Sequence, residues 1–213
     1  MKPTIFSVCL IAVGLMFSCQ SSDFKTKTGT DSNGYRYETV KGDPLNARIY
    51  TLDNGMKVYL AQNVEEPKIM TLITFRAGSK DDPRETTGLA HYFEHILFKG
   101  TQNLGTTNWE EESKLIEKIS DLFEEMKDTP DPKEKSLIYK RIDSLSYEAA
   151  KYAIPNEYDK LVNTMGAEYT NAFTSYDMTT YINQVPSNEL ERWLWIESER
   201  FTNLVMRLFH TEL

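Results

Sequence analysis

Residues 87–101 have the sequence TGLAHYFEHILFKGT, and this stretch carries two of the three histidines in the chain. Thr86 or Thr87 can cap a helix at its start, because a threonine hydroxyl accepts a hydrogen bond from the first free backbone N–H groups. We expect the helix to run to about Phe98, and Gly100 follows as a residue that commonly ends helices. The stretch therefore predicts a short helix that carries both histidines.

His91 and His95 have the spacing of a metal-binding pair. Residues four apart share one face of a helix, so both imidazoles could bind a single zinc ion at roughly 2.0–2.1 Å. Glu94 flanks this pair without replacing either ligand. Zinc lowers the pKa of a bound water to about 7, and a carboxylate beside it could take the proton and pass it to the leaving amine of a peptide. A buried or helix-capping histidine pair is the alternative interpretation.

A third zinc ligand is harder to identify, although catalytic zinc sites usually have three protein ligands. His210 is the only other histidine, and we interpret it first as a surface residue of the last helix. Glu197, Glu199 and Glu212 qualify by residue type alone, and glutamates on a charged helix are usually solvated.

Short runs of β-branched and aromatic residues predict two hairpins and one further strand. The first hairpin turns at Asn54-Gly55, a pair that tolerates the positive φ of a tight turn. The second turns at residues 175–177. The expected strands are residues 48–52, 57–60, 68–75, 167–174 and 178–185.

Helical periodicity in the middle of the chain predicts a pair of amphipathic helices at residues 109–126 and 131–152. Asp131-Pro132 is a typical start for the second one. We interpret this pair as a structural helical hairpin without chemistry of its own. A last helix is expected to begin at Pro186-Ser187, and no stop signal closes it before Leu213. Its expected core-facing residues are Leu190, Leu194, Phe201 and Val205.

The first 46 residues have the pattern of an export signal and a linker. Residues 1–18 combine a basic start with an apolar run too short to span a bilayer, which is typical of a secretory signal peptide. Residues 15–19, LMFSC, resemble a bacterial lipoprotein box, which implies cleavage before Cys19 and lipid on its thiol. An ordinary signal peptide with an incidental cysteine is the alternative. Residues 19–46 are expected to form a polar tether, with a folded domain at 47–213.

The composition limits the classes of partner and chemistry. The 213 residues carry a net charge of −8, which argues against a nucleic-acid partner. Both cysteines, Cys9 and Cys19, lie in the leader, so the folded domain can form neither a disulfide nor a cysteine metal site. With the leader, these features predict an exported, lipid-anchored protein of a bacterial cell envelope, facing the periplasm or the cell surface.

The histidine motif and its surroundings resemble the pitrilysin and insulinase family of zinc peptidases, the inverzincins. Residues 77–79 and 87–91 are similar to the family's approach to the motif, and residues 96–101 to its continuation. The resemblance implies an α/β (α+β) half-domain, a sheet flanked by helices, with His91 and His95 as zinc ligands and Glu94 as general base. It also implies that Asn171, Ala172, Phe173 and Thr174 form an edge strand that pairs with an extended peptide substrate.

Two departures from the family pattern shape the functional expectation. The helical hairpin, from about residue 109 to 165, is longer than the family's usual connection. The family's third ligand is a glutamate that would fall just beyond Leu213, and family members close a second half-domain around the substrate. We therefore expect an amino-terminal portion of a longer protein, with one zinc per complete protein and a second half-domain from the same or another chain.

Three functions remain open from the sequence. The first is a zinc-dependent metalloendopeptidase that hydrolyses peptides or unfolded polypeptides. The second is a non-catalytic relative that acts as a binding or partner subunit. The third is a fragment that is inactive alone. The intact motif favours the first, because inactive relatives usually lose motif residues.

Overall fold

The computed structural model describes residues 25–208, which divide between Glu66 and Pro67 into two compact units. The described part of the first unit contains strands, and the second contains both strands and helices, so the protein has the α/β class predicted from the sequence. No helix within the described residues is long and apolar enough to cross a membrane.

The first unit contains a four-stranded antiparallel sheet in the order β1-β2-β3-β4. Gly55 has a φ of 85° at the turn between β3 and β4, which confirms the Asn54-Gly55 hairpin. The strands are β1 (Thr26–Thr30), β2 (Arg36–Val40), β3 (Arg48–Thr51) and β4 (Lys57–Leu60).

The prediction of a polar tether over residues 19–46 is wrong for its larger part, because β1 and β2 form a paired hairpin there. Asp31 shapes the turn by accepting hydrogen bonds from the backbone N–H groups of Asn33 and Tyr35, both at 2.9 Å. The ring of Tyr37 packs over Gly29, where a Cβ atom would meet it at 2.6 Å. Residues 1–18 and Cys19 lie outside the described residues.

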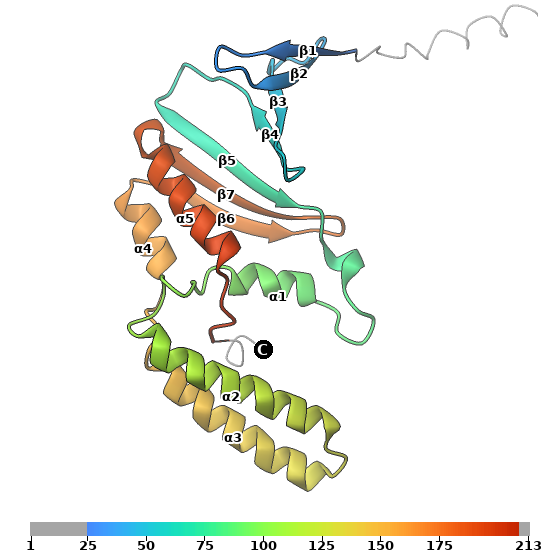
Figure 1. Ribbon diagram of the computed structural model, residues 1–213, viewed down its shortest axis with the longest axis vertical. Helices are drawn as coiled ribbons and strands as arrows, with labels where there is room; N and C mark the ends of the chain where they lie inside the picture. The colour runs from blue at the N-terminus through green and yellow to red at the C-terminus, as the bar shows by residue number, and fades with distance from the viewer. Residues whose placement is uncertain (1–24, 209–213) are drawn as a thin grey trace, which may run out of the picture. The chain divides into compact units, whose positions relative to one another are not determined.

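The second unit is built on a three-stranded antiparallel sheet in the order β5-β7-β6. Its strands are β5 (Lys68–Phe75), β6 (Tyr169–Thr174) and β7 (Thr179–Pro186), which confirms the second hairpin. Helices α4 (Glu157–Thr164) and α5 (Leu190–Thr202) lie along one face of this sheet (Figure 1). The core between them consists of Tyr158, Val162, Met165, Val185, Trp193 and Ile196.

Helices α2 (Trp109–Asp128) and α3 (Pro132–Ala150) form the predicted helical hairpin (Figure 1). The side chain of Asn108 caps α2, and that of Asp131 caps α3 immediately before Pro132. Leu122, Ile138 and Ile142 make a small core of their own between the two helices.

Three local expectations are corrected. The first helix, α1 (Leu89–Ile96), begins after Gly88, whose φ of 95° suits glycine, rather than after a threonine cap. In α5, Leu194 is 51% exposed instead of facing the core. This helix ends at Thr202, so Val205 is buried from the segment that follows it. The remaining short elements are two 3-10 helices, η1 (Ser79–Asp81) and η2 (Ser187–Glu189).

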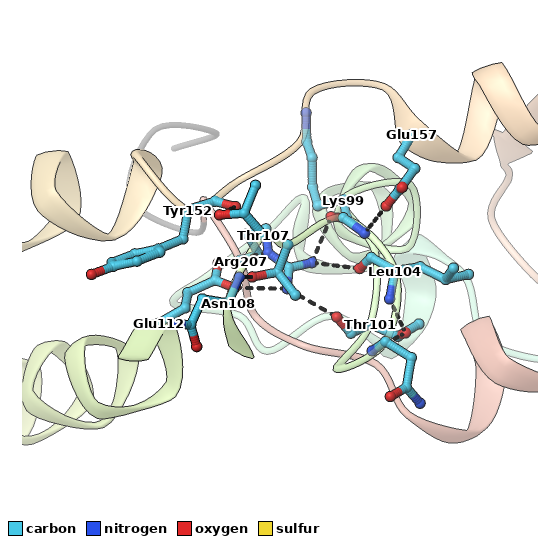
Figure 2. Close-up of polar contacts among 12 residues, drawn as sticks. Lys99, Thr101, Leu104, Thr107, Asn108, Glu112, Tyr152, Glu157 and Arg207 are labelled. Carbon is cyan, nitrogen blue, oxygen red and sulfur yellow. Dashed lines mark hydrogen bonds and ion pairs between the residues drawn. The ribbon is translucent and has the colours of Figure 1, made fainter. Parts of the chain in front are cut away.

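A buried arginine joins three segments that are far apart in the sequence. Figure 2 shows Arg207, which follows α5, between Glu112 of α2 and the loop after α1. Its Nε and Nη2 atoms donate to the two carboxylate oxygens of Glu112 at 2.6 and 2.9 Å. Its Nη1 and Nη2 atoms donate to the backbone carbonyls of Lys99, Thr101 and Leu104 at 2.9–3.0 Å. Arg207 therefore fixes the chain that leaves α1.

Candidate active site

The helix that carries the histidine motif is held at its start by the loop before it. The carboxylate of Asp82 accepts hydrogen bonds from the backbone N–H groups of Gly88, at 2.7 Å, and Ala90, at 2.8 Å. These groups have no partner inside the helix, and a carboxylate at a helix amino terminus is also favoured by the helix dipole. The orientation of α1 is therefore set before the motif begins.

His91 and His95 lie on one exposed face of α1, as their spacing predicted. Their Nε2 atoms are 3.3 Å apart, and the ring centroids are 4.8 Å apart with an interplanar angle of 79°. If an ion lay 2.0–2.1 Å from both nitrogens, the nitrogen–ion–nitrogen angle would be about 107°, close to the tetrahedral value that zinc prefers. The two nitrogens thus fit zinc, and its binding there stays a prediction.

Glu94 lies on the inner side of the same helix and is only 8% exposed. Its Oε2 atom accepts a hydrogen bond of 2.5 Å from the hydroxyl of Thr174, at the end of β6. The two residues are 80 positions apart in the sequence, so the motif itself gave no signal of this contact. A buried carboxylate beside two exposed imidazoles can receive a proton from a group that the imidazoles help to bind.

The predicted substrate strand is an edge strand in the structure. β6 pairs with β7 on one side, and no other strand among residues 25–208 pairs with its second side. Phe173 is 41% exposed, and the side chain of Asn171 bonds within its own strand. Ala172 lies between them and is half-buried. Pairing of these residues with a peptide stays a prediction, and the Thr174 side chain points toward α1.

The candidate third ligands are engaged elsewhere or lie outside the described residues. Within residues 25–208 no group of three or more His, Cys, Asp or Glu residues is placed to hold a metal ion. Glu197 is 3% exposed, pairs with Arg200 and accepts from Tyr158 at 2.7 Å, so the expectation that it is solvated is wrong. His210 and Glu212 lie outside the described residues.

Glu199 is likewise held in a local network rather than aimed at the histidines. Thr101, Asn103 and Asn203 donate side-chain hydrogen bonds to its carboxylate at 2.7–2.9 Å. Desolvation acts to raise the pKa of Glu199, but the three donated hydrogen bonds outweigh it, so this pKa lies below its usual value. The network fixes the end of α5 against the loop after α1.

A buried arginine on α5, Arg200, was not predicted from the sequence. The Arg200 guanidinium lies 4.3–5.1 Å from four aromatic ring centroids, those of Phe98, Tyr158, Tyr181 and Phe201. Cations attract aromatic faces in this range. Burial raises the pKa values of Tyr158 and Tyr181, which keeps both phenols protonated. The spacing of Trp193, Ile196 and Arg200 on one helix face was the available signal.

Comparison with known families identifies part of the chain. Residues 57–122 match the profile of the family described as "Insulinase (Peptidase family M16)", a segment that includes His91, Glu94 and His95. The chain is 35% identical over 72 residues to an insulin-degrading enzyme homolog of Dictyostelium discoideum. It is also 35% identical over 68 residues to Protease 3 of Escherichia coli strain K12.

These alignments cover a small part of the relatives. They span 34% of this chain and 6% of the Dictyostelium protein, and 30% of this chain and 7% of the E. coli protein. Among solved structures, pitrilysin superposes with a TM-score of 0.51 at 17% identity, over 88% of this chain and 15% of pitrilysin. The fold is therefore similar to one portion of pitrilysin.

Proposed function

We propose that this chain is the catalytic amino-terminal portion of a zinc-dependent metalloendopeptidase, because residues 57–122 match the insulinase family, peptidase family M16. The observation that supports the proposal most directly is the placement of His91, His95 and Glu94 on α1. Two imidazole nitrogens lie 3.3 Å apart on its exposed face, and Glu94, next to His95 in the sequence, is buried on its inner side. This arrangement would place a zinc-binding pair and a proton acceptor on one helix.

Each residue then has a distinct role in the proposed reaction. His91 and His95 would hold the ion, together with a third ligand from a part of the protein beyond residue 208. When bound, zinc would supply a Lewis acid that polarises a peptide carbonyl and acidifies water. Glu94 would take the proton of the attacking water and return it to the leaving amine. The same carboxylate would therefore act first as a base toward water and then as an acid toward the leaving amine.

The open edge of β6 supports a peptide as the substrate. An extended chain can add to a sheet edge through its backbone N–H and C=O groups, which gives affinity with little dependence on side chains. Asn171, Ala172 and Phe173 would form that pairing surface. A folded protein rarely offers such an extended segment, so we expect peptides or unfolded polypeptides as substrates.

The proposal extends to the complete protein and its location. It includes one zinc per complete protein and a second half-domain, from the same or another chain, that closes over the peptide. It also includes export to the cell envelope with lipid attached at Cys19. Mass spectrometry of the mature amino terminus tests the anchor, and an unmodified terminus at another residue would contradict it.

The central test is metal content and peptide hydrolysis in the protein expressed from its complete gene. Glu94→Gln should retain zinc and lose hydrolysis, because the amide cannot accept the proton. His91→Ala and His95→Ala should each lose zinc. The exposed Glu85, in the loop before α1, provides a matched control, and Glu85→Gln should leave both properties unchanged. Hydrolysis by Glu94→Gln at the wild-type rate would remove Glu94 as the base.

A further inference from the structure

The hydroxyl of Thr174 is committed to Glu94. It lies 2.5 Å from Glu94 Oε2 and 3.2 Å from the hydroxyl of Thr179 on the neighbouring strand. Thr179 is 6% exposed and donates its own hydrogen to the backbone carbonyl of Ala77 at 3.0 Å. Each hydroxyl has one hydrogen, so the hydrogen of Thr174 is left for the carboxylate of Glu94.

The end of β6 is held firmly enough to impose this contact. The turn after β6 accepts hydrogen bonds from the loop before α1, where Ser79 N–H donates to Ser175 at 3.0 Å and Lys80 N–H donates to Tyr176 at 3.1 Å. Lys80 also pairs with Asp177 at 2.7 Å. The loop that precedes α1 is therefore tied to the turn that follows Thr174, and the two partners are fixed from both sides.

A carboxylate held through one oxygen has a defined orientation. The Thr174 hydroxyl bonds to Oε2, so Oε1 would be the oxygen available to take a proton. Without the hydroxyl, the glutamate side chain would be free to rotate about its last torsion, which is broad for sp2 groups. Small misplacements of a catalytic group lower the rate strongly, because reactive geometry is narrow.

We propose that Thr174 is a positioning residue for Glu94, and that it links the β6 edge to the catalytic carboxylate. This inference rests on the proposed peptidase function. It also divides the segment 171–174, in which Thr174 was expected to serve the substrate like its neighbours. Asn171, Ala172 and Phe173 present the edge to the peptide, while Thr174 orients the carboxylate that acts on it. A peptide that pairs with β6 would then lie in fixed register with Glu94.

The kinetic test compares Thr174→Val, which removes the hydroxyl at nearly constant volume, with Thr174→Ser, which keeps it. A lost hydrogen bond to a charged group predicts a kcat that is about 10- to 100-fold lower in Thr174→Val, with KM within about twofold. Thr174→Ser should restore most of kcat. Thr170 lies on the same face of β6 and bonds to Asn183 instead, at 3.1 Å, so Thr170→Val is a matched control and should keep kcat.

Wild-type kcat in Thr174→Val, or no rescue in Thr174→Ser, would overturn the inference. Failure of the proposed function gives a different result, in which the wild type and Glu94→Gln hydrolyse peptides equally slowly.

A stability cycle tests the contact without any activity. Melting temperatures are measured for the wild type, Thr174→Val, Glu94→Ala and the double variant. Thr174→Val should lower the melting temperature by about 3–6 °C when Glu94 is present. It should have little effect in the Glu94→Ala background, where the partner is already lost. Additive shifts would show that the two side chains do not interact, and the inference would then be wrong.

Discussion

Replacing Arg207 with methionine is expected to destabilise the second unit more than any substitution of a surface charge. Arg207 is 1% exposed, and so is its partner Glu112. Methionine fills similar volume but donates no hydrogen bond. The substitution therefore leaves a buried carboxylate without its partner, and it removes one hydrogen bond from each of three backbone carbonyls in the loop after α1.

The expected loss can be worked out from these contacts. Breaking a buried ion pair by removing one partner typically costs about 3–5 kcal/mol. Of the three carbonyls, that of Thr101 is bonded in a buried position, that of Lys99 is in a part-buried bond that water can replace, and that of Leu104 keeps a hydrogen bond from the Thr101 N–H at 2.7 Å. One stranded carbonyl adds about 1 kcal/mol. The total of about 4–6 kcal/mol is a large part of the roughly 5–15 kcal/mol that stabilises a typical domain.

Urea unfolding followed by tryptophan fluorescence measures this difference. Lys114 provides a matched control on α2, the helix that carries Glu112. Lys114 pairs with Glu111 at 2.6 Å, and both of these side chains are about half exposed. Lys114→Met should leave the free energy of unfolding nearly unchanged, because exposed ion pairs contribute little. The double variant Glu112→Leu/Arg207→Met should recover part of the loss, since it strands no charge. Equal stability of Arg207→Met and Lys114→Met would refute this reasoning.

Two further predictions concern the packing and the acid response of the second unit. Gly78→Ala should lower the free energy of unfolding by about 1–3 kcal/mol in the same urea assay, because a Cβ atom there would meet backbone atoms of the turn after β6 at 2.5–2.6 Å. Gly88 cannot serve as the control, although its position is open, because its φ of 95° would add backbone strain to any substitution. Wild-type stability of Gly78→Ala would show that the turn can move aside. Because the pKa of Glu199 is lowered in the folded state, its ionised carboxylate should stabilise the fold at pH values above 4.5, the usual pKa of a glutamate. This contribution should be lost as the pH falls through the lower pKa of the folded state. Glu199→Gln should therefore weaken the acid dependence of unfolding, and an unchanged pH profile would contradict it.

The features that the sequence predicted are those set by local periodicity. Helix geometry places His91 and His95 on one face because they are four residues apart. The turn at Asn54-Gly55 follows from the φ values that those residues tolerate. The helical hairpin was predicted because its apolar stripe and its proline start are both local signals. In each case the information lies within one or two turns of the chain, so a single sequence contains it.

The features that the sequence did not predict depend on contacts that composition and periodicity do not show. β1 and β2 are polar strands, stabilised by pairing and by Tyr37 packing over Gly29, so their composition alone indicated a linker. Glu197 is buried because Tyr158 and Arg200 satisfy its charge, although a glutamate on a charged helix is usually solvated. The contact of Thr174 with Glu94 likewise arises from the topology. The contacts of Glu197 with Tyr158 and of Thr174 with Glu94 join residues 39 and 80 positions apart, which local patterns do not reveal.

The long connection between α1 and β6, which includes the helical hairpin, does not separate the two parts of the candidate site, because it is closed at its base. The Thr107 N–H donates to the carbonyl of Tyr152 at 2.8 Å, and Figure 2 shows these two residues side by side. The Ile154 N–H donates to the carbonyl of Gly105 at 2.9 Å, so the chain enters and leaves the hairpin at one place. Glu112 anchors the first turn of α2 through Arg207, whereas the rest of the hairpin packs on its own small core. Because the ends are closed at this point, the length of the hairpin beyond Glu112 has little effect on the loop that follows α1. Shortening α2 and α3 by matched turns beyond this anchor should therefore preserve the contact of Thr174 with Glu94, while any change that includes Glu112 should not.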